Sequence, residues 1–313
     1  MAVALVAVLG AAPASARGLR GLPDWVRPAA RYLVGENAID IASFAPNQPM
    51  TRKSFTHVMT KVFGGGYSKT SGTVHTAEVD AALVRVLGRA SLAAQLRKVS
   101  TPDGWQPQTN KWFGTEIVAR EMGLRYDHGT SDEGLEASRD DEMSQGNVAY
   151  AVWRAATSPS TYGADELESF SLPNLDETQQ KVVQYAFSQV GIPYVWGGEW
   201  PLTTSSAYPY GTQTHGGFDC SGFSWYVLRK ASGTWTPRRR PYAGWNLPER
   251  SSSQMAGATR NKLSFKELKP ADLVFFASGG RGSSASSVYH VGVFLGHGWM
   301  IDSSGSQDGV SLS

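Results

Sequence analysis

Hydrophobic residues in the first part of the chain recur at helical spacing. The stretch 25–39 places Trp25, Ala29 and Leu33 four positions apart, as one face of an amphipathic helix requires. The run that follows Thr51 repeats this pattern, and threonine is a residue type that caps helix N-termini. The two stretches therefore predict two amphipathic helices joined by a turn.

Three further segments have the same helical pattern, and they are 77–99, 114–124 and 138–156. We expect Ser138 to cap the last of them. Residues 20–156 are therefore predicted to form a mainly α-helical domain.

The pattern changes after residue 156. The segment 157–175 has no sustained periodicity and contains two prolines, which is typical of a linker. Asp176 and Gln179 stand three positions apart before an apolar run, the spacing of a capping box. We therefore expect a new helix, and a second domain, to begin at residue 176.

This second domain, residues 176–313, contains short β-rich runs. The clearest are 271–277 and 290–296, which are separated by segments rich in Gly and Ser. Helices that precede such runs indicate an α+β domain with an antiparallel sheet.

Composition and charge exclude some classes of protein. The chain has 313 residues, of which 41% are hydrophobic and 18% charged, as in globular proteins with a buried core. A net charge of +2 without a basic stripe argues against a nucleic-acid partner, and "PRRRP" at 237–241 is expected to be a solvated loop. A single cysteine excludes an intramolecular disulfide and a cysteine-rich zinc site.

The N-terminal stretch resembles a secretory signal peptide, although no charged residue precedes its apolar run. Residues 14–16, Ala-Ser-Ala, form a small-x-small cleavage pattern. The apolar run is too short to span a bilayer. We expect residues 1–16 to be removed and the protein to be secreted or cell-wall-associated, with no transmembrane segment.

The single cysteine, Cys220, is a candidate nucleophile. It stands at the start of the predicted helix "CSGFSWYVLRK", where unpaired N–H groups favour a thiolate. Of the six histidines, His290 opens a β-run, where a rigid strand would hold a base. Asp302 lies twelve residues later, on the expected neighbouring strand, and is a candidate to orient the imidazole.

Four ordered motifs resemble the NlpC-type cell-wall peptidase family, which has a papain-like fold. They are "GIPYVWGG" (191–198), "FDCSGF" (218–223), "LKPADLVFFA" (268–277) and "HVGVFLGHGWMID" (290–302). The resemblance implies that Cys220 is the nucleophile and His290 the base. Asp302 falls where the family most often has His, Asn or Gln.

The resemblance also implies roles around the nucleophile. Tyr194 corresponds to a tyrosine beside the thiol, which contacts the oxyanion or the substrate, whereas Trp196 is expected to pack. Asp219 and Ser221 correspond to positions that bind the amine end of a stem peptide. A backbone N–H of Cys220 or Ser221 would complete an oxyanion hole.

Two features depart from this family. Residues 199–217 form a longer approach to the nucleophile than is usual. The chain stops at "QDGVSLS", about where the last strands of the family begin, and a missing final strand would leave an unprotected sheet edge.

The helical domain resembles the S-layer homology repeat, with Thr51 and Arg52 in the place of its Thr-Arg pair. A second copy would run from 114 to 156, with Ser138-Arg139 at the motif, and 74–99 would belong to a further unit. The resemblance implies that Arg52 meets an anionic secondary cell-wall polymer. The alternative is that Arg52 caps or pairs within the helical domain.

These features together predict an exported peptidoglycan hydrolase that cleaves stem peptides, at the bond between D-γ-glutamate and the diamino acid, through a thioester. The mechanism needs no metal and no organic cofactor. Two alternatives stay open: an amidase or acyltransferase of the same fold, and a catalytically inactive wall-binding protein.

Overall fold

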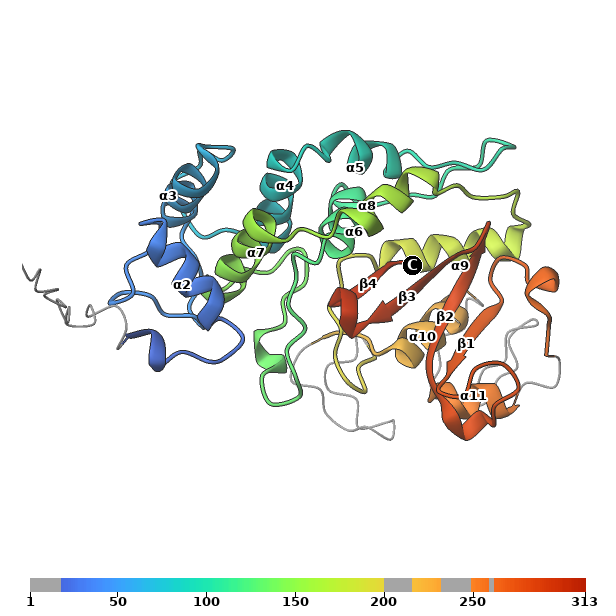
Figure 1. The fold of residues 1–313 in the computed structure, drawn as a ribbon. Helices are drawn as coiled ribbons and strands as arrows, with labels where there is room; N and C mark the ends of the chain where they lie inside the picture. Colours follow the sequence, from blue (N-terminus) through green and yellow to red (C-terminus); the bar gives the residue numbers. More distant parts are fainter. Residues whose placement is uncertain (1–17, 200–215, 232–248, 259–261) are drawn as a thin grey trace, which may run out of the picture.

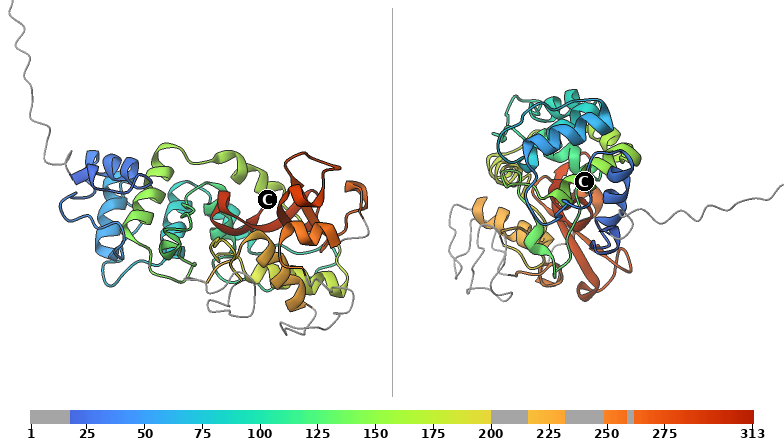
Figure 2. Two further views of the ribbon diagram at one scale, coloured as in Figure 1. Left: turned by 90° about the horizontal axis from the view of Figure 1, so that it is seen from below. Right: turned by 90° about the vertical axis from the view of Figure 1, so that its left-hand side faces the viewer.

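The structure of the protein is a computed structural model that describes residues 18–199, 216–231, 249–258 and 262–313. The molecule is elongated, with helices at one end and an antiparallel sheet at the other (Figure 1, Figure 2). This arrangement confirms the predicted α+β class. The predicted signal peptide, the basic stretch 237–241 and most of the approach to the nucleophile lie outside the described residues.

The first two predicted helices are confirmed. They are α2 (Arg27–Gly35) and α3 (Arg52–Phe63). The hydroxyl of Thr51 accepts the backbone N–H of Ser54 at 3.1 Å, as expected of an N-cap.

The remaining helices of this part depart from the prediction at two places. The segment 77–99 forms two helices, α4 (Thr76–Val86) and α5 (Ala90–Leu96), because the chain turns at Gly88, whose φ is +74°. After α6 (Phe113–Glu121), helix α7 (Gln145–Thr157) begins later than predicted. Its cap is Ser144 and not Ser138, since Ser144 accepts the N–H of Asn147.

Helices α3, α4 and α7 start around a closed ring of backbone hydrogen bonds. Met50 N–H donates to Met143 C=O at 2.9 Å, Met143 N–H to Val74 C=O at 3.0 Å, and Val74 N–H to Met50 C=O at 3.0 Å. Each of these residues directly precedes the N-cap of one of the three helices. The three helix starts are therefore held together by main chain as well as by side chains.

The segment predicted as a linker carries short helical elements, which its lack of periodicity did not predict. It contains α8 (Thr161–Glu166) and the 3₁₀ turn η2 (Leu167–Ser169). Leu167 and Leu172 are buried and belong to the hydrophobic core. Helix α9 (Glu177–Ser188) follows, and Asp176 with Gln179 forms the predicted capping box.

The C-terminal part carries a four-stranded antiparallel sheet in the order β1-β2-β3-β4. Its strands are β1 (Leu273–Ala277), β2 (Val288–Gly296), β3 (Trp299–Ser304) and β4 (Gly309–Leu312). Strand β4 pairs with β3, so the stretch at which the sheet was expected to lack a strand itself forms one. The other described elements of this part are α10 (Cys220–Ala231), α11 (Ser252–Ala258), η3 (Phe265–Glu267), η4 (Ala285–Ser287) and η5 (Gly305–Gln307).

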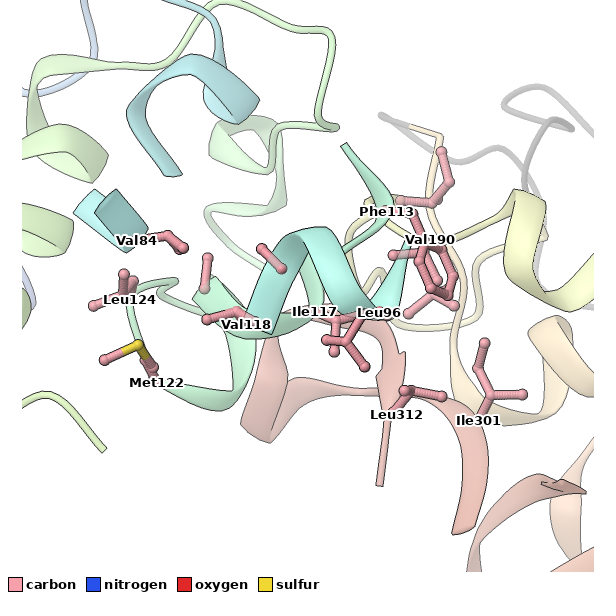
Figure 3. Packing of buried hydrophobic residues seen from close by; sticks show 14 of the residues in the cluster. Val84, Leu96, Phe113, Ile117, Val118, Met122, Leu124, Val190, Ile301 and Leu312 are labelled. Atoms are coloured by element: carbon pink, nitrogen blue, oxygen red, sulfur yellow. The ribbon is translucent and has the colours of Figure 1, made fainter. Parts of the chain in front are cut away.

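The two parts of the chain share one hydrophobic core. Helix α10 packs against β2 and β3, while α6 of the helical part contacts β4. Ile117 of α6 and Leu312 of β4 belong to the same apolar cluster (Figure 3). Helix α6 thus packs against β4, the strand that pairs with β3. Among the described helices, none is long and apolar enough to cross a membrane.

Candidate active site

Cys220 is the first residue of α10, and the side chain of the preceding residue, Asp219, caps the N-terminus of this helix. Asp219 Oδ1 accepts the backbone N–H of Gly222 at 2.5 Å and the hydroxyl of Ser221 at 2.9 Å. The first of these bonds satisfies one of the free N–H groups at the start of the helix, and both hold the first turn that carries Cys220. Cys220 keeps 8% of its surface exposed, so the thiol is sheltered but not fully enclosed.

The start of α10 also depends on a glycine. A Cβ on Gly222 would lie 2.1 Å from the carbonyl oxygen of Gly198 and 2.6 Å from the guanidinium of Arg250. Residue 222 must therefore be glycine, because any side chain there would prevent the backbone of the motif "FDCSGF" from lying this close to the backbone of Gly198. The position of Cys220 therefore depends on this approach.

The structure brings His290 and Asp302 into direct contact. His290 Nε2 and Asp302 Oδ2 are 2.7 Å apart, between neighbouring strands β2 and β3. A side chain on Gly292 would crowd the carboxylate, since its Cβ would lie 3.2 Å from Asp302 Cβ. With Nε2 occupied by Asp302, Nδ1 is the ring nitrogen left for the thiol.

The surroundings of His290 favour the imidazolium. Burial by itself lowers the pKa of His290, but hydrogen bonds to Asp302 and to Cys220 outweigh it and raise the pKa to about 10. At neutral pH the ring therefore holds its second proton beside the sulfur. Such a pair can stabilise a thiolate and can donate a proton to a leaving group.

Tyr194 lies near the thiol. Burial, and then the neighbouring Cys220 and Asp219, raise the pKa of Tyr194. Its hydroxyl thus stays protonated and can act as a hydrogen-bond donor.

Trp196 is 65% exposed, so the prediction that it packs in the core is wrong. Its backbone N–H donates to Glu133 Oε1 at 2.9 Å, across to the turn η1 (Glu133–Leu135) of the helical part. This contact holds the backbone of the segment while the indole extends outward.

Asp219 and Ser221 meet a residue that the sequence analysis missed. The guanidinium of Arg250 donates to both oxygens of Asp219, at 3.0 and 3.2 Å, and to the hydroxyl of Ser221 at 2.8 Å. Arg250 is only 1% exposed, and it also bonds Glu199. The charge of Asp219 is therefore compensated inside the protein. No local pattern marks Arg250, because the partners of its side chain lie 29 to 52 residues away.

The two residues expected to bind the cell wall have partners inside the helical part. Thr51 caps α3, and Arg52 donates to Glu78 Oε2 through Nε at 3.1 Å and Nη2 at 2.8 Å. Arg52 Nη1 donates to the carbonyl of Ser71 at 3.1 Å. These contacts match the alternative in which Arg52 pairs within the helical domain.

One group of carboxylates has the spacing of a metal site. Among the described residues, Asp127, Glu136 and Asp308 have ligand atoms within 4.8 Å of one another. Arg125 Nε donates to Asp308 Oδ2 at 3.2 Å. Burial, and then the Asp308 charge, raise the pKa of Glu136 to about 11. The charge of Arg125 and the proton that Glu136 retains thus offset part of the negative charge of this group. The expectation of a metal-free mechanism stays a prediction.

Comparison with known proteins agrees with the motifs around this site. Residues 191–313 match the NlpC/P60 family model. A probable endopeptidase p60 of Listeria monocytogenes is 35% identical over 121 residues, which are 39% of this chain and 18% of that protein. The bifunctional muramidase/DL-endopeptidase CwlT of Bacillus subtilis is 34% identical over 127 residues, which are 41% of this chain and 30% of that protein.

Among solved structures, the NlpC/p60 domain of the peptidoglycan hydrolase SagA is 30% identical, with a TM-score of 0.28. That match covers 43% of this chain and 87% of the SagA domain. The chain spans less than a third of the length of the two curated relatives.

Proposed function

The C-terminal part of the chain is an NlpC/P60 family domain of cysteine-peptidase type, and from this premise we propose that the protein hydrolyses peptide bonds in peptidoglycan stems. The observation that carries the proposal is the hydrogen-bonded pair of His290 and Asp302, with Cys220 close enough to raise the pKa of the imidazole. This is the arrangement of a nucleophile, a base and an orienting group.

In the proposed reaction, the Cys220 thiolate attacks the carbonyl carbon of the scissile bond. A backbone N–H of Cys220 or Ser221 and the Tyr194 hydroxyl stabilise the oxyanion. The His290 imidazolium gives its proton to the leaving amine, and the C–N bond breaks to leave a thioester on Cys220. His290 then removes a proton from water, which attacks the thioester and releases the acid.

We propose that the bond cleaved joins D-γ-glutamate to the diamino acid. The name of the Bacillus subtilis relative, which includes DL-endopeptidase, supports this choice. Asp219 and Ser221 would lie at the amine end of the stem, and the guanidinium of Arg250 holds both of these side chains in place without contacting the amine.

Incubation of purified protein with defined muropeptides tests the activity. Mass spectrometry should show loss of the intact stem and a new pair of products that adds one water, and Cys220→Ala should abolish both. Products of amide release or acyl transfer would identify the alternative enzymes of this fold. Identical spectra for the wild type and Cys220→Ala would leave only a wall-binding protein.

We also propose that the protein acts outside the cell and that its helical part contacts the wall. The motif resemblance supports a wall polymer as the partner, and the recurring helix starts at Thr51, His75 and Ser144 support a repeated unit. Binding to isolated sacculi should fall in Arg52→Ala if that residue reaches the polymer. Unchanged binding would restrict Arg52 to its pair with Glu78.

A further inference from the structure

Asp302 is held at both of its carboxylate oxygens. Oδ2 meets His290 Nε2 at 2.7 Å, and Oδ1 accepts the hydroxyl of Ser313 at 2.7 Å. The residue is 1% exposed, so water does not replace either contact freely. A carboxylate fixed at both oxygens cannot rotate, and it holds the imidazole plane with it.

Ser313 is in turn held by β3 and by Gln307. Its N–H and C=O bond those of Met300, each at 2.9 Å, and Gln307 bonds the carbonyl of the preceding residue, Leu312, at 3.0 Å. The single proton of the Ser313 hydroxyl donates to Asp302 Oδ1 at 2.7 Å, and Gln307 Oε1 is a weaker second acceptor at 3.2 Å. The amide nitrogen of Gln307 faces two groups that serve as acceptors, the carbonyl of Leu312 at 3.0 Å and the carboxylate of Glu121. These acceptors fix which way the amide is turned, and its oxygen therefore points toward Ser313.

The helical part of the chain supplies the support for Gln307. Glu121 is the last residue of α6, and its neighbour Arg120 donates to the backbone carbonyl of Gln307 at 3.0 Å. Arg125 donates to Asp308, the next residue of the β3–β4 connection, at 3.2 Å. Both arginine side chains are at most 3% exposed, so these contacts are shielded from solvent.

We propose that Gln307 and Ser313 are positioning residues for the peptidase reaction, through which the helical part of the chain sets the orientation of Asp302 toward His290. This inference rests on the proposed function, because it assigns Asp302 the role of orienting the base. It gives the helical part a catalytic consequence that is independent of any wall polymer.

The electrostatic state of Glu121 agrees with this connection. Burial, followed by the charges of Asp302 and Glu166, raises the pKa of Glu121 to about 7. Glu121 thus lies close enough to sense the charge of Asp302.

Gln307→Ala in the full chain tests the proposal. We expect kcat on muropeptides to fall about tenfold, with KM changed less than about twofold. The variant loses the bond to the Leu312 carbonyl that positions Ser313, and Ser313 orders the base through Asp302 and does not bind the substrate. The rate of Cys220 alkylation by iodoacetamide should also change its pH profile. A loosely held Asp302 lowers the pKa of His290, so the alkaline limb should move to lower pH.

Gln184→Ala is a matched control. The Gln184 amide also joins the two parts of the chain, since it bonds the N–H and C=O of Gln108, each at 2.7 Å, but it has no path to Asp302 through the described hydrogen bonds. This variant should keep the wild-type kcat and alkylation profile. Equal losses in both variants would show a general weakening of the interface and would overturn the proposal.

Two further substitutions separate hydrogen bonding from charge. Glu121→Gln keeps an oxygen that accepts from Gln307, so activity should stay within about twofold of the wild type. Glu121→Ala removes the acceptor and should behave like Gln307→Ala. If Gln307→Ala fails to fold, as judged by its thermal unfolding, then Ser313→Ala applies the same test from an exposed side chain.

The inference and the proposed function fail in different ways. Cleavage by the wild type together with unchanged kcat and alkylation profile in Gln307→Ala overturns the inference alone. If no muropeptide is cleaved, the alkylation profile still reports whether the imidazole is held. An unshifted profile in both Gln307→Ala and Ser313→Ala would then overturn the positioning role.

Discussion

Removal of the Asp302 carboxylate should change the chemistry of the site more than its fold. The ordinary pKa of histidine is 6.5, and in the protein hydrogen bonds to Asp302 and Cys220 raise the pKa of His290 to about 10. At about 1.36 kcal/mol per pKa unit, this preference for the imidazolium corresponds to ~5 kcal/mol. Asp302 supplies the largest favourable contribution, so Asp302→Ala should lower the pKa of His290 by at least about one unit.

The expected consequence is a narrower range of pH over which the imidazolium faces the thiol. We expect kcat/KM of Asp302→Ala to fall roughly 100-fold, which corresponds to about 2.7 kcal/mol of transition-state stabilisation. The alkaline limb of the pH–rate profile should move to lower pH by at least about one unit. Asp302→Asn should lie between the wild type and Asp302→Ala, because its side-chain oxygen can accept one hydrogen bond but carries no charge.

Two assays check this expectation, namely muropeptide cleavage and alkylation of Cys220 across the pH range. Asp272→Ala is a suitable control. Asp272 Oδ2 accepts the N–H of Lys269 at 2.7 Å, and among the described residues its side chain has no hydrogen bond to Cys220, His290 or Asp302. If Asp302→Ala has the wild-type rate and its alkaline limb lies at the wild-type pH, the view that Asp302 orients His290 and raises its pKa is refuted.

Three further predictions concern stability. Gly222→Ala should destabilise the protein by about 3 kcal/mol in thermal unfolding, because its Cβ would overlap the carbonyl of Gly198, whereas Gly257→Ala, with 3.5 Å to its nearest neighbour, should have little effect. Asp176→Ala should cost about 1 kcal/mol in denaturant titration without a change in kcat, since it removes the cap of α9. Burial opposes ionisation of Glu78, but hydrogen bonds from Lys69 and Arg52 outweigh it and lower the pKa from 4.5 to about 2, so wild-type stability should fall as the pH drops from 4.5 toward 2. Glu78→Gln should show a smaller fall over the same range, and an equal fall would contradict this assignment.

Patterns between near neighbours in the sequence predicted much of the local structure. The capping residues Thr51 and Asp176 begin helices as expected, because a cap bonds an N–H only two or three residues away. Ser138 failed as a predicted cap because the chain turns there by a different bond, in which Ser138 donates to Asp141. The cap of α7 is Ser144, which directly follows Met143. Met143 belongs to the ring of backbone hydrogen bonds that joins the starts of α3, α4 and α7.

In the candidate site, too, some features follow from local sequence patterns and others from contacts between distant residues. Cys220 at a helix start and His290 and Asp302 on consecutive strands follow from motif and alternation, and a hairpin brings such strands together. The helical elements within 157–175 were not predicted, because a segment with little periodicity can still bury apolar side chains such as Leu167 and Leu172 in the core.

The sequence by itself determined the helices that follow the caps Thr51 and Asp176 and the β-runs at 271–277 and 290–296, because those features depend on bonds and patterns that span a few residues. Only the tertiary structure decided that Arg250 pairs with Asp219 and that Arg120 holds Gln307, across 31 and 187 residues of chain. Such partners are selected by the packing of whole elements: a buried charge needs a partner, but its own neighbours in the sequence do not specify which one.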